Sequence, residues 1–160
     1  MIIAVDFDGT CTTHEYPHIG RDIGAERVLK RLVADGNRII LWTMRSGNEL
    51  DEAVQWFQKR NIPLFGVNRN PHQINWTKSP KPYAQLYIDD AALGCPLCKP
   101  RHPGDTQYVD WEAVEQMLFP LAGEPSRTIE GGAISCSAGQ PRVRPPNLWA
   151  KILVCLGISV

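Results

Sequence analysis

Polar side chains that can do chemistry follow three apolar runs of this sequence, each at the point where the run ends. They are four carboxylates and one hydroxyl: Asp6, Asp8, Thr43, Asp89 and Asp90. Carboxylates gathered at one place repel one another unless a positive charge lies among them. Hard oxygen ligands of this kind suit Mg²⁺, which keeps bound waters and takes one or two carboxylates together with a substrate phosphate. The sequence therefore predicts a site with Mg²⁺ as cofactor.

The spacing of Asp6 and Asp8 suits a two-step displacement at phosphorus. A carboxylate that the metal does not need can attack phosphorus and form an aspartyl-phosphate. The second carboxylate, two residues later, can protonate the leaving oxygen and afterwards activate water. Gly9 would let the backbone turn sharply after the strand, and its amide and that of Thr10 could face phosphate oxygens.

A hydroxyl and a cation would complete such a site. Thr43 offers its hydroxyl to the same phosphate. A lysine is expected because a cation offsets the charge on the nucleophile and on the transferring group. Lys81, shortly before Asp89, is the best candidate, and Lys78 is the alternative. Arg45 could assist phosphate binding or form a surface ion pair.

The apolar runs have the length and β-branched content of buried strands. They cover residues 2–5, 39–42, 64–67 and 86–88. Their continuous apolar character suits a parallel sheet that is covered on both faces. In such a sheet the site lies at the carboxyl ends of the strands, so side chains from separate strands converge on one edge.

Helical patterns lie between and after these runs. Apolar residues recur at helical spacing over three stretches, residues 25–33, 50–57 and 111–118. Gly36 is placed to end the first helix, Asp110 to cap the third, and Ser46 or Asn48 to cap the second. The alternation of strands and helices predicts an α/β sandwich with right-handed crossovers.

Length and composition predict one folded domain with a tail. The chain has 160 residues, enough for one domain with its own core. We expect that domain to cover residues 1–121. Residues 122–160 are rich in proline and glycine and are expected to form a flexible tail, with a short apolar segment at 148–160. That segment is shorter than the roughly 20 residues that cross a bilayer, so no membrane partner is expected.

Charge and cysteine usage favour a cytoplasmic protein. Seventeen basic and seventeen acidic residues cancel, which argues against bulk attraction to nucleic acid or to an anionic membrane. Five cysteines, with no secretory signal ahead of them, favour free thiols in a reducing compartment. Cys95 and Cys98 lack the second ligand pair that a structural zinc site needs, so packing is the preferred interpretation.

Four segments resemble the motifs of the haloacid dehalogenase (HAD) superfamily. They are Asp6-Phe7-Asp8-Gly9-Thr10, Thr43, Lys81 and Asp89-Asp90, similar to the first, second, third and fourth motifs. Their order and spacing match across residues 1 to about 120. Within the superfamily the chain is similar to a compact group of bacterial and phage hydrolases, through residues 16–20, 88–97 and 109–111.

The resemblance implies a Rossmann-like three-layer sandwich with a mainly parallel sheet and no cap domain, and phosphoryl transfer that requires Mg²⁺. It makes Asp6 the nucleophile and Asp8 the acid/base, while Thr43 and Lys81 bind phosphate. The metal ligands that it implies are Asp6, the backbone carbonyl of Asp8, Asp89 and Asp90. Asp90 could instead only orient Asp89.

Short connections leave the predicted site open, because no insertion is long enough for a cap. We therefore expect a phosphomonoester phosphatase that acts on a small phosphorylated substrate or on a phosphorylated macromolecule. An alternative is a nucleotide or polynucleotide-end phosphatase, which the neutral net charge argues against. A HAD-like binding module with little turnover is the alternative from a different class. The intact Asp6, Asp8 and Asp89 argue against it.

Overall fold

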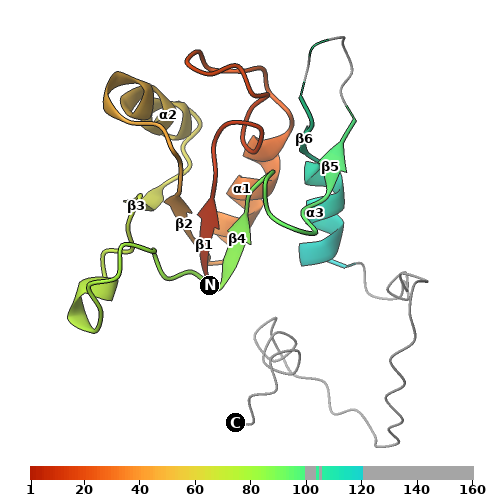
Figure 1. Cartoon of the computed structure of the whole chain (residues 1–160). Coiled ribbons are helices and arrows are strands. Elements are labelled where there is room, and N and C mark those ends of the chain that lie inside the picture. Colours follow the sequence, from red (N-terminus) through yellow and green to blue (C-terminus); the bar gives the residue numbers. More distant parts are fainter. Residues whose placement is uncertain (100–103, 105, 121–160) are drawn as a thin grey trace, which may run out of the picture. The chain divides into compact units, whose positions relative to one another are not determined.

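The computed structural model of the chain describes residues 1–99, 104 and 106–120. They form a four-stranded parallel sheet, three α-helices and a two-stranded antiparallel sheet (Figure 1). The predicted Rossmann-like α/β fold is confirmed. The predicted tail at 122–160 lies outside the described residues. Within the part of the chain that the structure describes, no helix is long and apolar enough to span a membrane.

The four parallel strands are β1 (Ile2–Val5), β2 (Arg38–Leu41), β3 (Leu64–Val67) and β4 (Leu86–Ile88). Their order in the sheet is β3-β2-β1-β4, so β1 lies between β2 and β4. Three of the four strands begin and end at the predicted residues, and β2 begins and ends one residue earlier than expected. The short antiparallel pair is β5 (Leu97–Cys98) with β6 (Tyr108–Val109).

The three helices are α1 (Ala25–Ala34), α2 (Gly47–Lys59) and α3 (Trp111–Leu118). Gly36 follows α1 with a φ of 79°, a left-handed conformation that ends the helix as predicted. The Asp110 carboxylate accepts hydrogen bonds from the amides of Glu112 and Ala113, so the predicted cap of α3 is confirmed. Ser46 is the N-cap of α2, although its side chain makes no capping hydrogen bond.

One face of the sheet packs against all three helices. Its inward side chains and those of the helices form a single buried cluster, which includes Ile3, Val5, Ile39, Leu41, Val28, Leu29, Phe57 and Trp111. Phe7, just after β1, contacts Trp56 of α2 edge to face with ring centroids 5.8 Å apart. Burial of these large side chains fixes α2 near the carboxyl end of β1, where the predicted site lies.

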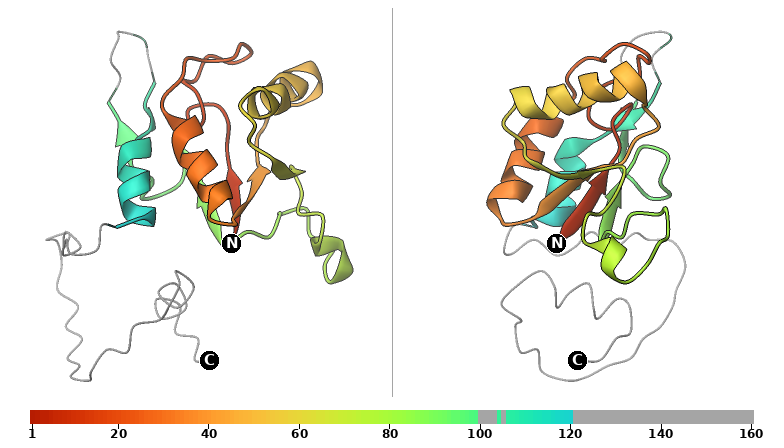
Figure 2. Two further views of the ribbon diagram at one scale, coloured as in Figure 1. Left: turned by 180° about the vertical axis from the view of Figure 1, so that it is seen from behind. Right: turned by 90° about the vertical axis from the view of Figure 1, so that its left-hand side faces the viewer.

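Irregular chain lies beside the other face. Ile40 is fully buried there and is paired in register with Gly66. A Cβ on Gly66 would clash with the carbonyl of Arg69 and lie 3.1 Å from Pro71, so the segment after β3 packs directly on the sheet. This segment contains the short 3-10 helix η1 (Gln73–Asn75), which lies on the side of the sheet away from α1 (Figure 2).

Candidate active site

A pocket of about 530 Å³ lies at the carboxyl ends of β1, β2 and β4. Its lining residues are Asp6, Asp8, His14, Tyr16, Thr43, Met44, Arg45, Asp89, Asp90 and Ala91. The structure thus brings together all four carboxylates and the hydroxyl singled out in the sequence. Met44 is 97% exposed and Tyr16 57% exposed, so the rim of the pocket is open to solvent.

Three of the carboxylates form a group that can hold a metal ion. Asp6, Asp89 and Asp90 each offer an oxygen, and these oxygens all lie within 4.8 Å of one another. The amide of Asp6 donates to the carbonyl of Ile88 at 3.0 Å, which aligns the end of β1 with the end of β4. All-oxygen donors of this kind fit Mg²⁺.

The turn after β1 is shaped to receive Asp90. Gly9 has a φ of 75°, and a Cβ there would lie 2.8 Å from Cγ of Asp90, so both conformation and space require glycine. The buried hydroxyl of Thr10 accepts from the amide of Asp90 at 3.0 Å. The amide of Thr10, predicted to face phosphate, donates instead to the carbonyl of Phe7 within the turn.

The electrostatics of the cluster favour a bound cation. Burial raises the pKa of Asp6 to about 7, repulsion from Asp89, Asp90 and Asp8 adds to it, and a backbone hydrogen bond from Phe7 works in the opposite direction. Burial and the charge of Asp89 also raise the pKa of Asp90. A divalent ion among these oxygens would relieve both effects.

Replacing Asp6 by Asn is therefore expected to stabilise the metal-free protein. The pKa of Asp6 is about 7 in the folded protein, whereas that of an aspartate in an unfolded chain is about 3.9. Between these values the folded state binds more protons, so wild-type stability falls as pH rises through this window and stays low above it. The gain from Asn approaches at most about 4 kcal/mol at pH 8, and it is absent below the unfolded pKa.

Thermal unfolding in EDTA at pH 5 and pH 8 measures this difference. We expect the Tm of Asp6→Asn to exceed that of the wild type by several degrees at pH 8 and by clearly less at pH 5. A variant that melts at or below the wild-type Tm at pH 8 would contradict the electrostatic argument.

Asp8 is held by Arg45. The Arg45 side chain has no solvent-exposed surface, and its guanidinium donates through Nε to Oδ2 at 2.8 Å and through Nη2 to Oδ1 at 2.7 Å. Arg45 is thus a buried partner of the proposed acid/base rather than half of a surface ion pair. Its Nη1 and Nη2 also donate to the carbonyls of Pro17 and His18, at 2.9 and 2.7 Å.

The loop after β2 is fixed by a residue that the sequence analysis did not single out. Asn68, just after β3, accepts from the amide of Thr43 at 2.8 Å and donates to its carbonyl at 2.9 Å. The hydroxyl of Thr43 accepts from the amide of Arg45 at 3.2 Å. Asn68 has a φ of 50°, a left-handed conformation that asparagine tolerates well. The sequence feature that could have indicated this role is an asparagine directly after the strand 64–67.

The structure does not bring the predicted lysine to the pocket. Lys81 and its alternative Lys78 are both exposed, and neither lines it. The ammonium of Lys81 lies 5.4 Å from the ring centroid of Tyr87, and the Lys81 carbonyl accepts from the buried Gln73 amide at 2.9 Å. Lys81 precedes β4, whereas the pocket lies beyond the other end of that strand. Among the described residues that line the pocket, Arg45 is the one lysine or arginine, and its guanidinium contacts Asp8.

The cysteines near β5 form no metal site in the described structure. Among residues 1–99, 104 and 106–120, the one group with metal-ligand geometry is the aspartate cluster. Cys95 is half-buried and packs against the core, as predicted, and burial raises the pKa of its thiol.

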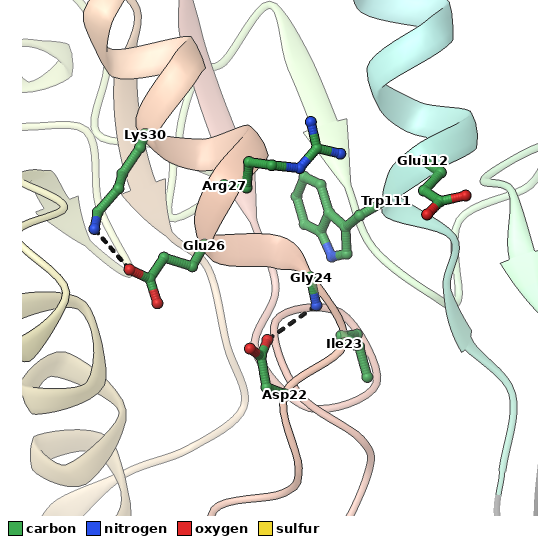
Figure 3. A pocket seen from close by; sticks show the side chains of 8 residues that line it. All are labelled: Asp22, Ile23, Gly24, Glu26, Arg27, Lys30, Trp111 and Glu112. Atoms are coloured by element: carbon green, nitrogen blue, oxygen red, sulfur yellow. Dashed lines mark hydrogen bonds and ion pairs between the residues drawn. The ribbon is translucent and has the colours of Figure 1, made fainter.

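A second cavity, of about 410 Å³, lies beside the first turns of α1 and α3 (Figure 3). Both of its basic side chains form ion pairs, Lys30 with Glu26 at 2.6 Å and Arg27 with Glu115 at 2.5 Å. Its link to the site is Trp111, whose indole nitrogen donates to the carbonyl of Thr10 at 2.6 Å. Trp111 therefore supports the turn that follows β1.

Replacing Trp111 by Phe should destabilise the domain by about 1–3 kcal/mol, because the buried carbonyl of Thr10 loses its partner while most of the packing is kept. The midpoint of urea unfolding checks this. Tyr108→Phe is the matched control, since no hydrogen bond of the Tyr108 hydroxyl is found in the described part of the chain. Equal midpoints for wild type and Trp111→Phe would refute the supporting role of the indole.

The fold and the site together define a Rossmann-like α/β protein with an acidic pocket at the carboxyl edge of its parallel sheet. No family model and no curated protein matches the chain. A solved structure of a conserved protein from Bacteroides thetaiotaomicron is 38% identical, covers 73% of this chain and 88% of its own, and has a TM-score of 0.57. The chain belongs to the same family as that conserved protein, whose name states no activity.

Proposed function

We propose that this chain is a Mg²⁺-dependent phosphomonoester phosphatase that acts through an aspartyl-phosphate on Asp6. The observation that carries the proposal is the group of oxygens from Asp6, Asp89 and Asp90 within 4.8 Å of one another. They share a pocket with Thr43 and with Asp8. The resemblance of the four segments to HAD motifs supports the same activity. Mg²⁺ held there would neutralise the carboxylates and polarise a phosphoryl oxygen.

The side chains would act in two steps. In the first, a carboxylate oxygen of Asp6 forms a bond to phosphorus, the bond from phosphorus to the leaving oxygen breaks, and Asp8 gives its proton to that oxygen. In the second, Asp8 takes a proton from water as the water attacks phosphorus, which releases phosphate and restores Asp6. The Thr43 hydroxyl, at the pocket wall, would hold a phosphoryl oxygen during both steps.

A nucleotide or polynucleotide-end phosphatase is the second candidate, and one observation favours it. Tyr16 and Met44 are both exposed at the rim of the pocket, and together they offer an aromatic ring and a thioether to a nucleobase. A substrate that covers the rim would also compensate for the open site, which on its own excludes water poorly.

Phosphate release from a panel of phosphomonoesters, with Mg²⁺ or with EDTA, tests the proposal. The panel contains 4-nitrophenyl phosphate, glycerol 2-phosphate, nucleoside 5′- and 3′-monophosphates and a 3′-phosphorylated oligonucleotide. We expect release that requires Mg²⁺, and a preference for nucleotides would favour the second candidate. A folded, Mg²⁺-binding protein that releases no phosphate from any of them would contradict both and favour a binding module.

A further inference from the structure

We propose that Arg45 is a positioning residue that couples the acid/base Asp8 to the flap, which we define as residues 14–20. One guanidinium would set the orientation of Asp8 and hold the flap over the pocket, so that neither moves without the other. This inference rests on the proposed function, because it assigns Asp8 a role in protonating the leaving group.

The contacts of Arg45 divide evenly between the two partners. Two of its hydrogen bonds reach the carboxylate of Asp8 and two reach the backbone carbonyls of Pro17 and His18 in the flap. A buried guanidinium is costly unless it is paired and its donors are satisfied. Losing either partner would leave donors of a fully buried cation unsatisfied, so the arrangement is cooperative.

The rings around Arg45 extend this coupling to the pocket. The guanidinium carbon lies 5.0 Å from the ring centroid of Phe7 and 5.4 Å from that of Tyr16. Phe7, which lies between Asp6 and Asp8 in the sequence, is buried in the core, whereas Tyr16 belongs to the flap and lines the pocket. A substrate that touches Tyr16 would therefore act on Asp8 through Arg45, which contacts both residues.

The flap has a closed base. The amide of Thr13 donates to the carbonyl of Arg21 at 3.0 Å, and the amide of Arg21 donates to the hydroxyl of Thr13 at 2.8 Å. Within the flap, the amide of His18 donates to the carbonyl of Glu15. The tip is thus a tied loop, and the hydrogen bonds from Arg45 attach it to the loop that follows β2.

The fork geometry of the guanidinium is what orients Asp8. Two parallel hydrogen bonds fix the plane of a carboxylate, which a lysine ammonium cannot do. If this orientation serves proton transfer, its loss will matter most for esters whose leaving oxygen needs a proton. Alkyl phosphates belong to that class, whereas 2,4-dinitrophenyl phosphate has a leaving group that departs as the anion.

The test compares Arg45→Lys with the wild type on glycerol 2-phosphate and 2,4-dinitrophenyl phosphate. The comparison uses kcat/KM, which reports the first step alone, because the second step is the same for both esters. We expect kcat/KM for the glycerol ester to fall about 100-fold, and kcat/KM for the dinitrophenyl ester to change by less than about 5-fold. Asp8→Asn should show the same dependence on the leaving group. The double variant should be no slower than Asp8→Asn, because both changes remove one function.

Arg60→Lys is the matched control. Arg60 also lies over an aromatic ring, that of Trp56 at 4.1 Å, and pairs with Glu26, but it does not line the pocket. Its replacement should leave kcat unchanged for both esters. Hydrogen exchange gives a readout that does not depend on turnover. We expect amides of residues 14–20 to exchange faster in Arg45→Lys, with those of α2 unchanged.

Tyr16→Ala provides a second test of the coupling if Arg45→Lys does not fold. Tyr16 is exposed, so Tyr16→Ala is expected to fold, and the coupling predicts a several-fold loss in kcat/KM for the glycerol ester only. An equal loss of kcat/KM for both esters, or no loss for either, would overturn the coupling while leaving the phosphatase proposal intact. A wild type inactive on both esters would instead refute the phosphatase itself.

Discussion

Asp6→Asn is expected to lower Mg²⁺-dependent phosphate release from 4-nitrophenyl phosphate by roughly 10⁴-fold or more, because an amide cannot form the bond to phosphorus. Asp6 follows β1, an inner strand of the sheet, and its backbone is fixed there by the hydrogen bond to Ile88. Asparagine has nearly the same shape, so the variant tests chemistry and not packing.

Stopped-flow and steady-state measurements of phosphate release give the ratio of rates. Asp22→Asn is the control, because Asp22 is exposed, does not line the acidic pocket and accepts a hydrogen bond from Gly24 that asparagine can keep. Its kcat should equal that of the wild type. An Asp6→Asn protein that retains a tenth of the activity would exclude Asp6 as nucleophile.

The second large effect concerns the metal. Asp89→Asn should weaken Mg²⁺ binding by about 100-fold or more, since it removes one charge from a cluster of three carboxylates. Its oxygen Oδ1 accepts from the amide of Ala91 at 2.8 Å, and asparagine can keep this bond. The loss would therefore reflect charge and not a broken turn.

Titration calorimetry and thermal unfolding with Mg²⁺ measure this change. A ligand at 100 times its Kd stabilises the folded state by about 2.7 kcal/mol, which gives the wild type a clear rise in Tm that Asp89→Asn should lack. The rise should be greater at pH 8 than at pH 6, because a proton on Asp6, with a pKa of about 7, competes with the metal. Asp51→Asn, an exposed change on α2, should behave as the wild type. Identical Mg²⁺ affinities for the wild type and Asp89→Asn would exclude this site.

The strands and the carboxylates were predictable from the sequence because their signals are local. Continuous apolar runs mark strands buried on both faces, and in a parallel sheet the residues after each run must meet at one edge. Asp6 and Asp89 therefore meet although they are distant in the sequence. The one-residue offset of β2 arises because Trp42 continues the apolar run beyond the last residue of the strand.

The partners of these carboxylates were not predictable from local signals. Arg45 follows a strand as a surface arginine would, and its burial depends on carbonyls of the flap, contributed by a distant part of the chain. Lys81 was assigned by its distance from Asp89 along the sequence. That distance did not reveal that the Lys81 backbone is tied to Gln73 on the far side of β4 from the pocket.

The pairing of β1 with β4 has a consequence for biosynthesis. Of the four parallel strands, β1 is synthesised first and its neighbour β4 last. The amide of Ile2 donates to the side chain of Gln85, and the amide of Gln85 donates to the carbonyl of Ile2, so neither bond can form until Gln85 has been synthesised. On the ribosome, the first strand must therefore remain unpaired on that side until residue 88 has left the exit tunnel. The aspartates of the cluster come from both ends of this interval, so the proposed Mg²⁺ site would form only after β4 has paired with β1.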